Sequence, residues 1–440
     1  MKLFNDRGYE VNDVKILEDY FDALWPICRS IMGEGYRQSL DILSKLVPFQ
    51  RLKFSSGKKV LDWTVPQEWV VRDAYFIDPL GQKHAHFKTN NLHLINYSSP
   101  FSGTLPLTEL RQHLHSLPNQ PQAIPYLTSY YAPRWGFCIS HNELQSLPDG
   151  MYQVVVDTEF KPGRIEVGEV VLPGRSSKEV LFSTYLCHPS MANNELSGPL
   201  VMSLLYQKIA QIPERRFTYR FVILPETIGA ICYLQKRGRH LKKRLIAGYQ
   251  ISCVGDPGAF TYKLSRNGNT LADRAAQTFL QTQAGTKTIA FNPAEGSDER
   301  QYCSQGFDFP IGSLMRTPYG KYPEYHTSLD NKDFISFDAL AGSVSAYQEI
   351  VQVIENNFLW KSKVVYGEPQ LGKRGLLRSL STKALLDDEG VAFWWILNFA
   401  DGAKDLFDIA ERSKIKFSVL CSAASRLEVA GLISKVKKND

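Results

Sequence analysis

The sequence lacks the cysteine pattern of a disulfide-stabilised protein. Its seven cysteines are spread over 440 residues, are odd in number and include no Cys-x-x-Cys pair. Disulfide frameworks and thiolate zinc sites both depend on regularly spaced cysteines. We therefore expect reduced thiols in a cytoplasmic protein, and no zinc site built from thiolates.

Long apolar runs and a strong charge bias are also missing. No stretch approaches the roughly 18 apolar residues that a membrane-spanning helix requires. The polar start Met1–Arg7 has no signal-peptide core. The 51 Lys and Arg residues nearly balance 45 Asp and Glu, which leaves a net charge of +6. This small excess gives no reason to expect a membrane or nucleic acid as partner.

Several catalytic motifs are absent as well. There is no Gly-x-Ser-x-Gly elbow of a serine hydrolase, no Walker-type phosphate loop and no dinucleotide-binding glycine fingerprint. Cys187 stands next to His188, but neighbours on a strand point to opposite faces. We therefore do not expect Cys187 to be a thiol nucleophile activated by this histidine.

Changes of pattern along the chain predict the domain organisation. Helical periodicity comes first, and short β-prone runs such as 70–77 and 92–97 follow. Strand–helix alternation then predicts an α/β fold with a mostly parallel sheet flanked by helices. The predicted segments are an N-terminal helical part of the main domain at 1–54, an inserted β-rich domain at 55–150, an α/β domain at 151–366, a linker at 367–383 and a winged helix-turn-helix at 384–440.

Chemically active residues follow the ends of successive predicted strands. They are His188, Glu226 and Asp256, and a later loop adds His326. Ligands of open α/β sheets bind beyond the carboxyl ends of the strands, so the fold would gather these positions in one crevice. Each residue alone also fits a structural role, as a buried histidine, a helix-start carboxylate or a turn aspartate.

The order of these residues resembles that of the co-catalytic zinc aminopeptidases. More closely, the chain resembles a family of bacterial aminopeptidase-like proteins with a small inserted β domain and a C-terminal winged helix. The matching segments span nearly the full length. They are Asp62-Trp63-Thr64-Val65-Pro66, Cys187-His188-Pro189-Ser190, Pro225-Glu226-Thr227-Ile228-Gly229, Ser265-Arg266-Asn267-Gly268-Asn269, Gly296-Ser297-Asp298-Glu299-Arg300-Gln301-Tyr302-Cys303 and Tyr325-His326-Thr327-Ser328-Leu329-Asp330.

This resemblance implies a zinc-exopeptidase-like fold and a role for each matching position. His188, Asp256 and His326 match zinc ligands, and Glu226 matches the general base. Asn194 stands where the peptidases carry the aspartate that bridges two zincs, and Thr227 stands where they carry a zinc-binding glutamate.

The last two positions depart from the peptidase pattern. An amide cannot supply the negative charge that holds two dications together, and threonine is a poor zinc ligand. We therefore expect one zinc, with Glu195 replacing the missing carboxylate, and Glu226 taking a proton from the metal-bound water. A metal-free site with another role is the alternative.

Further residues are candidates for the pocket. Asp298 is expected to meet a substrate amine or to be a turn carboxylate. Arg316 is expected to hold a carboxylate or phosphate, or to lie on the surface. Tyr325, with Tyr319 and Tyr322, is a candidate pocket residue. Asp330 is expected to orient the His326 ring. The inserted domain is expected to wall one side of the pocket and limit substrate size.

The sequence thus predicts a zinc-dependent aminopeptidase-like hydrolase acting on a small-molecule or short peptide-like substrate at an amide bond next to a free amine. One alternative is a catalytically inactive ligand-binding relative, and another is a DNA-binding regulator. Residues 381–440 contain nine basic and nine acidic residues, and a neutral module lacks the electrostatic basis for DNA affinity. We expect the winged helix to pack on the enzyme or to mediate homo-oligomer contacts.

Overall fold

The computed structural model describes residues 11–376 and 388–436. The chain divides into two compact units, Met1–Asp273 with Gln283–Gln348, and Arg274–Thr282 with Glu349–Asp440. The first unit holds a large mixed sheet flanked by helices, so the predicted α/β fold class is confirmed. Among the described residues, no helix combines the length and apolarity needed to cross a membrane.

The central sheet has eight strands in the order β1-β10-β12-β11-β13-β16-β14-β15. Its middle strands β12, β11, β13 and β16 are parallel, and so is the edge pair β14 and β15, whereas β1 pairs antiparallel with β10, β10 with β12, and β14 with β16. β11 is buried along its whole length, as its apolar sequence predicts for a central parallel strand. The strands are β1 (Gln50–Ser55), β10 (Arg164–Leu172), β11 (Glu179–Tyr185), β12 (Thr218–Leu224), β13 (Leu245–Gln250), β14 (Thr261–Lys263), β15 (Lys287–Ile289) and β16 (Ile311–Met315).

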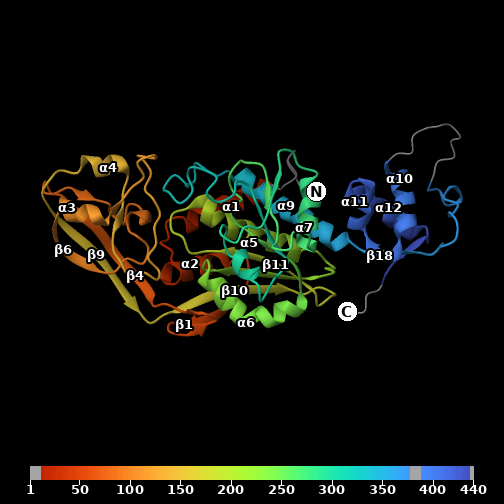
Figure 1. Ribbon diagram of the computed structural model, residues 1–440, viewed down its shortest axis with the longest axis horizontal. Helices are drawn as coiled ribbons and strands as arrows, with labels where there is room; N and C mark the ends of the chain where they lie inside the picture. Colours follow the sequence, from red (N-terminus) through yellow and green to blue (C-terminus); the bar gives the residue numbers. More distant parts are fainter. Residues whose placement is uncertain (1–10, 377–387, 437–440) are drawn as a thin grey trace. The chain divides into compact units, whose positions relative to one another are not determined.

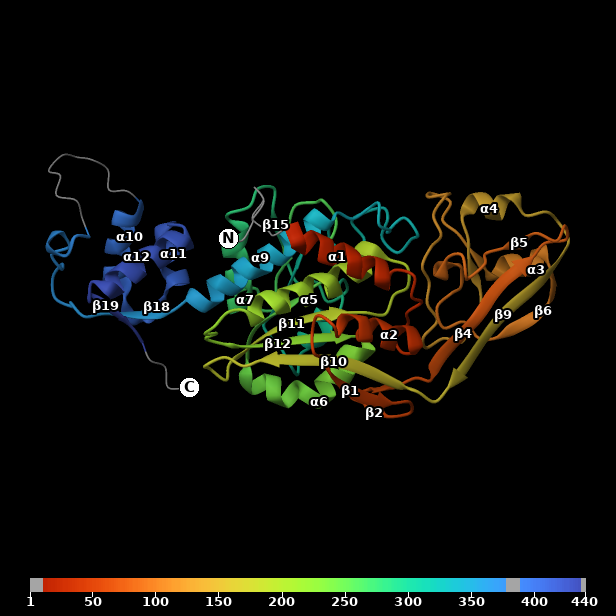
Figure 2. The same ribbon diagram turned by 180° about the vertical axis from the view of Figure 1, so that it is seen from behind.

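Helices cover both faces of this sheet. Figures 1 and 2 show α1 and α5 on one side and α6 on the other. The helix α5 begins directly after a π-helical turn at Ala192–Leu196, and nearly all of its first ten residues are buried. The helices of this unit include α1 (Val11–Leu24), α2 (Glu34–Leu43), α5 (Ser197–Ala210), α6 (Ile228–Arg244) and α8 (Glu299–Tyr302), while α7 (Leu271–Leu280) and α9 (Phe337–Asn356) contribute residues to both units.

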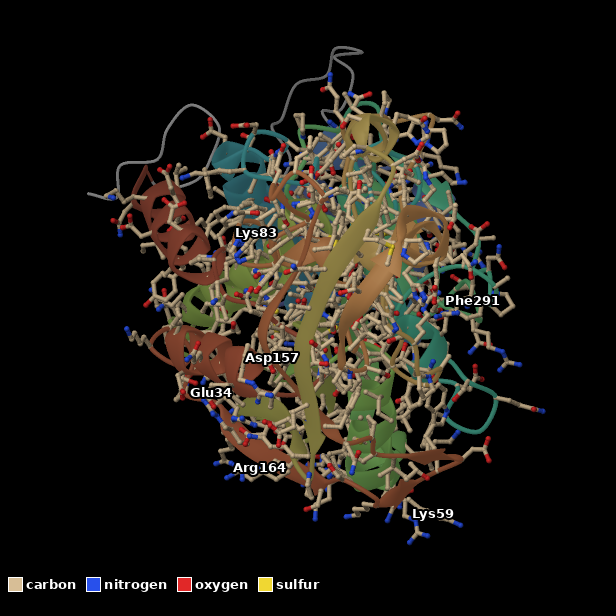
Figure 3. The ribbon with its side chains drawn as sticks, turned by 90° about the vertical axis from the view of Figure 1, so that its left-hand side faces the viewer. Glu34, Lys59, Lys83, Asp157, Arg164 and Phe291 are labelled. Carbon is tan, nitrogen blue, oxygen red and sulfur yellow. The ribbon has the colours of Figure 1, made fainter. Side chains whose placement is uncertain are left out.

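The inserted module forms a four-stranded antiparallel sheet in the order β5-β4-β9-β6. Figure 3 looks onto this end of the molecule, with Asp157 on the long strand β9. The module's elements are β2 (Lys59–Val60), β3 (Trp63–Thr64), β4 (Glu68–Ile77), β5 (Lys83–His84), β6 (Phe101–Pro106), α3 (Leu107–Leu110), β7 (Leu114–His115), β8 (Phe137–Cys138), α4 (His141–Ser146) and β9 (Met151–Lys161).

The boundary expected between 150 and 151 lies elsewhere in the structure. β9 pairs with β4 and β6 inside the inserted module and then leads into β10 of the central sheet. The sheet to which a strand belongs is decided by its partners, and these are distant in sequence. Residues 151–161 therefore belong structurally to the inserted sheet and not to the α/β domain.

The second unit has the element order expected of a winged helix. The helices α10 (Asp388–Phe399), α11 (Leu406–Ser413) and α12 (Phe417–Val429) accompany the sheet β18-β17-β19. Its strands are β17 (Leu359–Ser362), β18 (Asp401–Asp405) and β19 (Ile433–Lys435). β17 lies upstream of the linker predicted at 367–383, so this fold begins earlier than expected. Residues 377–387 and 437–440 of the predicted linker and domain lie outside the described residues.

Candidate active site

Parallel strands deliver the candidate residues to one edge of the central sheet. β11 ends at Tyr185, three residues before His188, and β12 ends at Leu224, two residues before Glu226. β13 lies on the other side of β11, and the chain beyond it leads to Asp256. The carboxyl ends of parallel neighbours meet at the same edge, which places these residues where the sequence predicted.

His188 lies between two carboxylates. Its Nδ1 is 2.6 Å from Oε2 of Glu195, and its Nε2 is 3.5 Å from Oε2 of Glu226. Glu195 is completely buried and also accepts the backbone N–H of Cys187. It therefore fixes the imidazole on its Nδ1 side. Carboxylates orient metal-binding histidines from this position.

The charge state of His188 depends on these neighbours. Burial disfavours the imidazolium, but the Cys187 sulfur and the Glu195 carboxylate more than compensate and raise the pKa of His188 well above its ordinary value of 6.5. A divalent cation at Nε2 must therefore displace a proton before it can bind.

His326 approaches His188 from the loop that follows β16. The centroids of the two rings are 5.7 Å apart. The His326 ring stacks on Tyr325 with a centroid distance of 4.0 Å and meets Tyr126 edge-on at 5.3 Å. Burial, together with the charge on His188, lowers the pKa of His326 to about 3. The ring is therefore neutral over the physiological pH range, as a metal ligand must be.

Glu226 has one oxygen positioned by the protein and one facing the histidine. Ser297 Oγ donates to Oε1 at 2.6 Å, while Oε2 faces Nε2 of His188. The Glu226 side chain is 28% exposed, so a water molecule can reach it. This arrangement suits a general base, because the contact with Ser297 orients the carboxylate and does not occupy both of its oxygens.

Asp298 is buried beneath Glu226. Its Oδ1 accepts the backbone N–H of Thr227 at 2.7 Å, and its Oδ2 has no partner among the described residues. Burial first, and then the charge of Glu226, raise the pKa of Asp298 well above 3.8. This shift disfavours the negative charge that the predicted contact with a substrate ammonium would use.

Asp256 contacts Asn193 of the turn that precedes α5, and its carboxylate is fully engaged. Oδ1 accepts hydrogen bonds from Thr317 Oγ1 at 2.7 Å and from the Gly258 N–H at 2.9 Å. Oδ2 accepts hydrogen bonds from Asn193 Nδ2 and the Thr317 N–H, both at 3.0 Å. Because a carboxylate offers about four acceptor positions, Asp256 has to give up one of these bonds before it can coordinate a metal.

The π-helical turn presents Asn193 to Asp256, whereas Asn194, the residue expected at the metal position, has other contacts. The backbone carbonyl of Asn194 accepts the Tyr185 hydroxyl at 2.6 Å, and its Nδ2 is buried without a partner in the described part of the chain. Reasoning from sequence missed Asn193, because spacing alone does not show which of two adjacent amides turns toward the site.

Asp330 supports this turn instead of the His326 ring. Its two oxygens accept the backbone N–H groups of Asn193 at 2.6 Å and Asn194 at 2.8 Å. The expectation that Asp330 orients the imidazole is therefore replaced by a capping role. The His326 ring is instead held between the rings of Tyr325 and Tyr126.

Arg316 is engaged in holding the fold. Its guanidinium donates to the carbonyls of Gly258 and Ala339 at 2.8 and 2.9 Å, and to Ser343 Oγ at 3.1 Å. It also lies over the Phe260 ring, 4.5 Å from the centroid. Because its guanidinium is used in these contacts, Arg316 is not included in the proposed site as a residue that binds a substrate anion.

The inserted module holds the loop that carries His326. The Tyr126 N–H donates to the His326 carbonyl at 2.8 Å, and the Ser328 N–H donates to the Ile124 carbonyl at 2.9 Å. The Tyr126 ring also lies 5.0 Å from that of His188. Sequence reasoning missed Tyr126, because this pairing joins segments about two hundred positions apart.

Strained backbone surrounds the same site. Thr227 has φ = +62°, and Ser190, Cys253 and His326 have φ values of +47°, +51° and +55°. A positive φ is especially unfavourable for a β-branched residue such as threonine. Strain of this kind is concentrated at functional sites, where the surrounding structure maintains it.

The donor set fits one catalytic zinc. Two imidazoles with a nearby carboxylate are typical of such sites. The atoms Cys187 Sγ, His188 Nδ1 and Glu195 lie within 4.8 Å of one another, but the 2.6 Å between Nδ1 and Oε2 is a hydrogen bond. Ligands of a tetrahedral zinc with bonds of about 2.0–2.1 Å lie roughly 3.3 Å apart. The metal side of His188 is therefore Nε2, which faces Glu226.

Similarity to known proteins agrees with this fold. The chain is 39% identical over 415 residues to a Clostridium acetobutylicum protein, covering 94% of this chain and 95% of that protein. That protein is provisionally named as a polysaccharide biosynthesis protein with an aminopeptidase-like domain. A crystal structure from the same organism, provisionally described as a peptidase, has a TM-score of 0.90 and 38% identity, and 97% of each chain is covered.

More distant structures share the fold alone. The zinc aminopeptidase BSAP of Bacillus subtilis has a TM-score of 0.55 at 11% identity, covering 79% of this chain and 95% of that chain. A peptidase precursor from Shewanella amazonensis has a TM-score of 0.54 at 13% identity, covering 80% and 93%. The profile of a winged helix-turn-helix matches residues 359–435. Residues 18–357 match the family described as a domain of unknown function, DUF4910, and the chain belongs to that family.

Proposed function

We propose that this protein is a zinc-dependent aminopeptidase-like hydrolase that cleaves an amide or peptide bond next to a free amine with one metal ion. The observation that carries the proposal is the convergence of His188 Nε2 on Glu226 at 3.5 Å, with the His326 ring 5.7 Å from that of His188. The peptidase-like fold of the relatives supports the same reaction class.

Each residue of the proposed site has a separate task. His188 and His326 would hold the zinc, and Asp256 would be a third ligand if it released one of its hydrogen-bond donors. Zinc in such a site lowers the pKa of a bound water to about 7 and polarises a carbonyl. Glu226 accepts the proton from the attacking water and delivers it to the leaving amine.

The surrounding residues position these groups. Glu195 holds the imidazole of His188 so that Nε2 faces the reaction centre. Ser297 holds one Glu226 oxygen and leaves the other directed at the same place. Burial and the charge of Glu226 raise the pKa of Asp298, which disfavours a second negative charge beside Glu226.

The test combines metal analysis with an assay of aminoacyl-p-nitroanilides and small aminoacyl amides. Protein purified without chelator should contain about one zinc per chain and hydrolyse at least one of these substrates. Glu226→Gln should retain the zinc and lose about 10²- to 10⁴-fold in kcat. His188→Ala and His326→Ala should lose both zinc and activity, whereas Glu159→Gln, an exposed carboxylate on β9, should change neither.

A catalytically inactive ligand-binding protein remains the second candidate. The observation in its favour is the Asp256 carboxylate, whose two oxygens are already held by donors from Asn193, Thr317 and Gly258. The same measurements of zinc content and hydrolysis distinguish the hydrolase from the ligand-binding protein. Protein that binds no zinc when it is supplied, and that hydrolyses none of the substrates, contradicts the hydrolase and supports the binding protein.

A further inference from the structure

A cavity of about 200 Å³ opens directly beside Glu226. It is lined by residues of the main domain and of the inserted module, which are Ile31, Trp63, Tyr130, Tyr131, Cys187, Glu226, Thr227 and Ile228. Because Glu226 forms part of its wall, any group that fills this cavity lies next to the proposed reaction centre. What the cavity accepts therefore bears directly on the choice of substrate.

Aromatic rings of the inserted module form one wall of this cavity. Trp63 and Tyr131 meet edge to face with their centroids 5.1 Å apart. The hairpin that carries Trp63 is tied to α6 by a hydrogen bond from the Leu61 N–H to Gln235 Oε1 at 3.2 Å. Contacts of this kind make the wall a defined surface and not a loose flap.

The neighbouring Tyr130 is fixed on both sides. Its hydroxyl hydrogen-bonds that of Tyr126 at 3.0 Å, and its ring packs edge-on against Tyr97 at 5.1 Å. Tyr126 in turn contacts the rings of both His188 and His326. The aromatic wall and the proposed metal ligands are therefore held by the same set of contacts.

The remainder of the lining is mostly apolar. Ile31, Ile228 and Cys187 contribute hydrocarbon and sulfur, and Glu226 is the one charged residue in the lining. A charged or polyhydroxylated group placed here would lose its water without gaining matching partners, which is unfavourable for each polar group left unpaired. The lining chemistry therefore selects an apolar group.

The size of the cavity indicates how large this group is. An apolar cavity of about 150 Å³ is sufficient to bind benzene, and this one is larger. A phenyl ring or a branched aliphatic side chain would fill most of it, whereas a methyl group would leave most of it empty. Edge-to-face and stacked contacts with Trp63 and Tyr131 favour a ring in particular.

We infer that this cavity is the specificity pocket of the enzyme. It takes a large apolar, preferably aromatic, side chain on the substrate residue that carries the free amine next to the cleaved bond. Trp63 and Tyr131 are the residues that set this preference. The inference rests on the proposed function, since it assumes that Glu226 lies at the scissile bond. It assigns the inserted module a direct part in substrate choice.

Kinetics on matched substrates test the inference. Phenylalanyl- and leucyl-p-nitroanilide should be cleaved with kcat/KM at least about tenfold above alanyl- and glutamyl-p-nitroanilide. Trp63→Ala and Tyr131→Ala should lower kcat/KM for the phenylalanyl substrate at least about tenfold and leave the alanyl substrate within about threefold. Trp63→Phe should restore most of the loss, and Tyr366→Ala, at a residue 93% exposed, serves as the control.

If Trp63→Ala and Tyr131→Ala lower kcat/KM equally for all four substrates, or do not lower it at all, the inference is overturned. Circular dichroism of each variant checks that it has folded, and Tyr131, which is 52% exposed, is the less disruptive position. Calorimetric binding of free L-phenylalanine and L-alanine to the zinc-loaded protein separates the two claims. One outcome is that no substrate is hydrolysed, but that L-phenylalanine binds selectively and Trp63→Ala removes this binding. This result would support the pocket and contradict the proposed hydrolase.

Discussion

Glu195 is the residue on which the orientation of His188 depends. It is completely buried, lies 2.6 Å from Nδ1 and also accepts the Cys187 N–H. A carboxylate in this position raises the basicity of the imidazole and restricts its rotation. In the proposed zinc site the contribution of Glu195 would therefore be indirect, and it would differ from the direct coordination that the sequence suggested.

Replacing Glu195 by glutamine should weaken zinc binding by about 10- to 100-fold without abolishing it, because the ligands themselves remain. Competition with a chromophoric chelator measures the dissociation constant. Glu34→Gln, on the exposed surface of α2, is the control and should leave the affinity unchanged. Complete loss of zinc in Glu195→Gln would instead show that Glu195 is itself a ligand.

Asn194 and Thr227 are the two positions expected to limit the site to one metal. Both stand where the resembling peptidases carry carboxylates, and neither supplies a negative charge. The double variant Asn194→Asp with Thr227→Glu should raise the zinc content from about one to about two per chain. Elemental analysis after dialysis against zinc checks this. A stoichiometry that does not change would show that Asn193 or the backbone, and not these two side chains, sets the number of metals.

At the residue scale, the sequence identified His188, Glu226 and His326 as neighbours because strand ends and motif order gather them. It did not predict that Asp256 would be saturated by Asn193 and Thr317. Such hydrogen bonds depend on side-chain directions within a turn, which residue spacing does not encode.

At the scale of elements, a buried ion network joins three neighbouring strands of the central sheet. Arg220 on β12 pairs with Glu169 on β10 at 2.5 Å and with Glu179 on β11 at 2.7 Å, and all three side chains are at most 6% exposed. Burial alone would raise the pKa of both glutamates, but hydrogen bonds and the arginine charges lower it below the ordinary value. The network therefore holds these three strands together only while it is ionised.

Arg220→Ala should destabilise the protein by up to about 3–5 kcal/mol, because two buried carboxylates each lose one partner, although Glu169 keeps Arg237 and Glu179 keeps His240. Denaturant unfolding of wild type and variant measures the difference. The matched control is Arg72→Ala, which breaks an exposed pair with Asp157 on the inserted sheet and should cause no measurable change. A small effect for Arg220 would show that water replaces the lost partner.

The same network predicts the direction of a pH effect. A carboxylate whose pKa is lowered in the folded state contributes stability above its unfolded pKa of about 4.3 and loses it as the pH falls through the folded value. Wild type should therefore lose stability below about pH 4.3 more steeply than Arg220→Ala. Denaturant midpoints measured between neutral and acidic pH check this, and parallel curves would contradict it.

The sequence predicted the elements of the central sheet well, and in the inserted module it predicted the run 70–77, which is part of β4, but not the conformation of the run 92–97. β11 and β12 are apolar runs followed by helical patterns, and these local signals sufficed. The run 92–97, expected as a strand, instead contains a short 3₁₀ turn at Asn91–His93, capped by the Asn90 side chain. β9 was assigned to the wrong domain because its partners are distant in sequence.

For the whole molecule, the division into two units predicts how the protein responds to metal. The proposed zinc ligands His188, Asp256 and His326 all lie in the first unit. A ligand that binds only the folded state stabilises it by about 2.7 kcal/mol at a hundredfold excess over Kd. Zinc should therefore raise the temperature of one unfolding transition and leave that of the winged helix unchanged. Calorimetry with and without zinc measures this, and two transitions that shift together would contradict independent units.

The central claim is that His188 and His326 hold one zinc beside Glu226. Anomalous diffraction at the zinc edge, from crystals of the zinc-loaded protein, tests it most directly. The account predicts a single peak within about 2.0–2.1 Å of Nε2 of His188 and of one His326 nitrogen, where zinc–imidazole bonds form. No peak between the two rings, or a peak on the Nδ1 side of His188 beside Cys187 and Glu195, would contradict it.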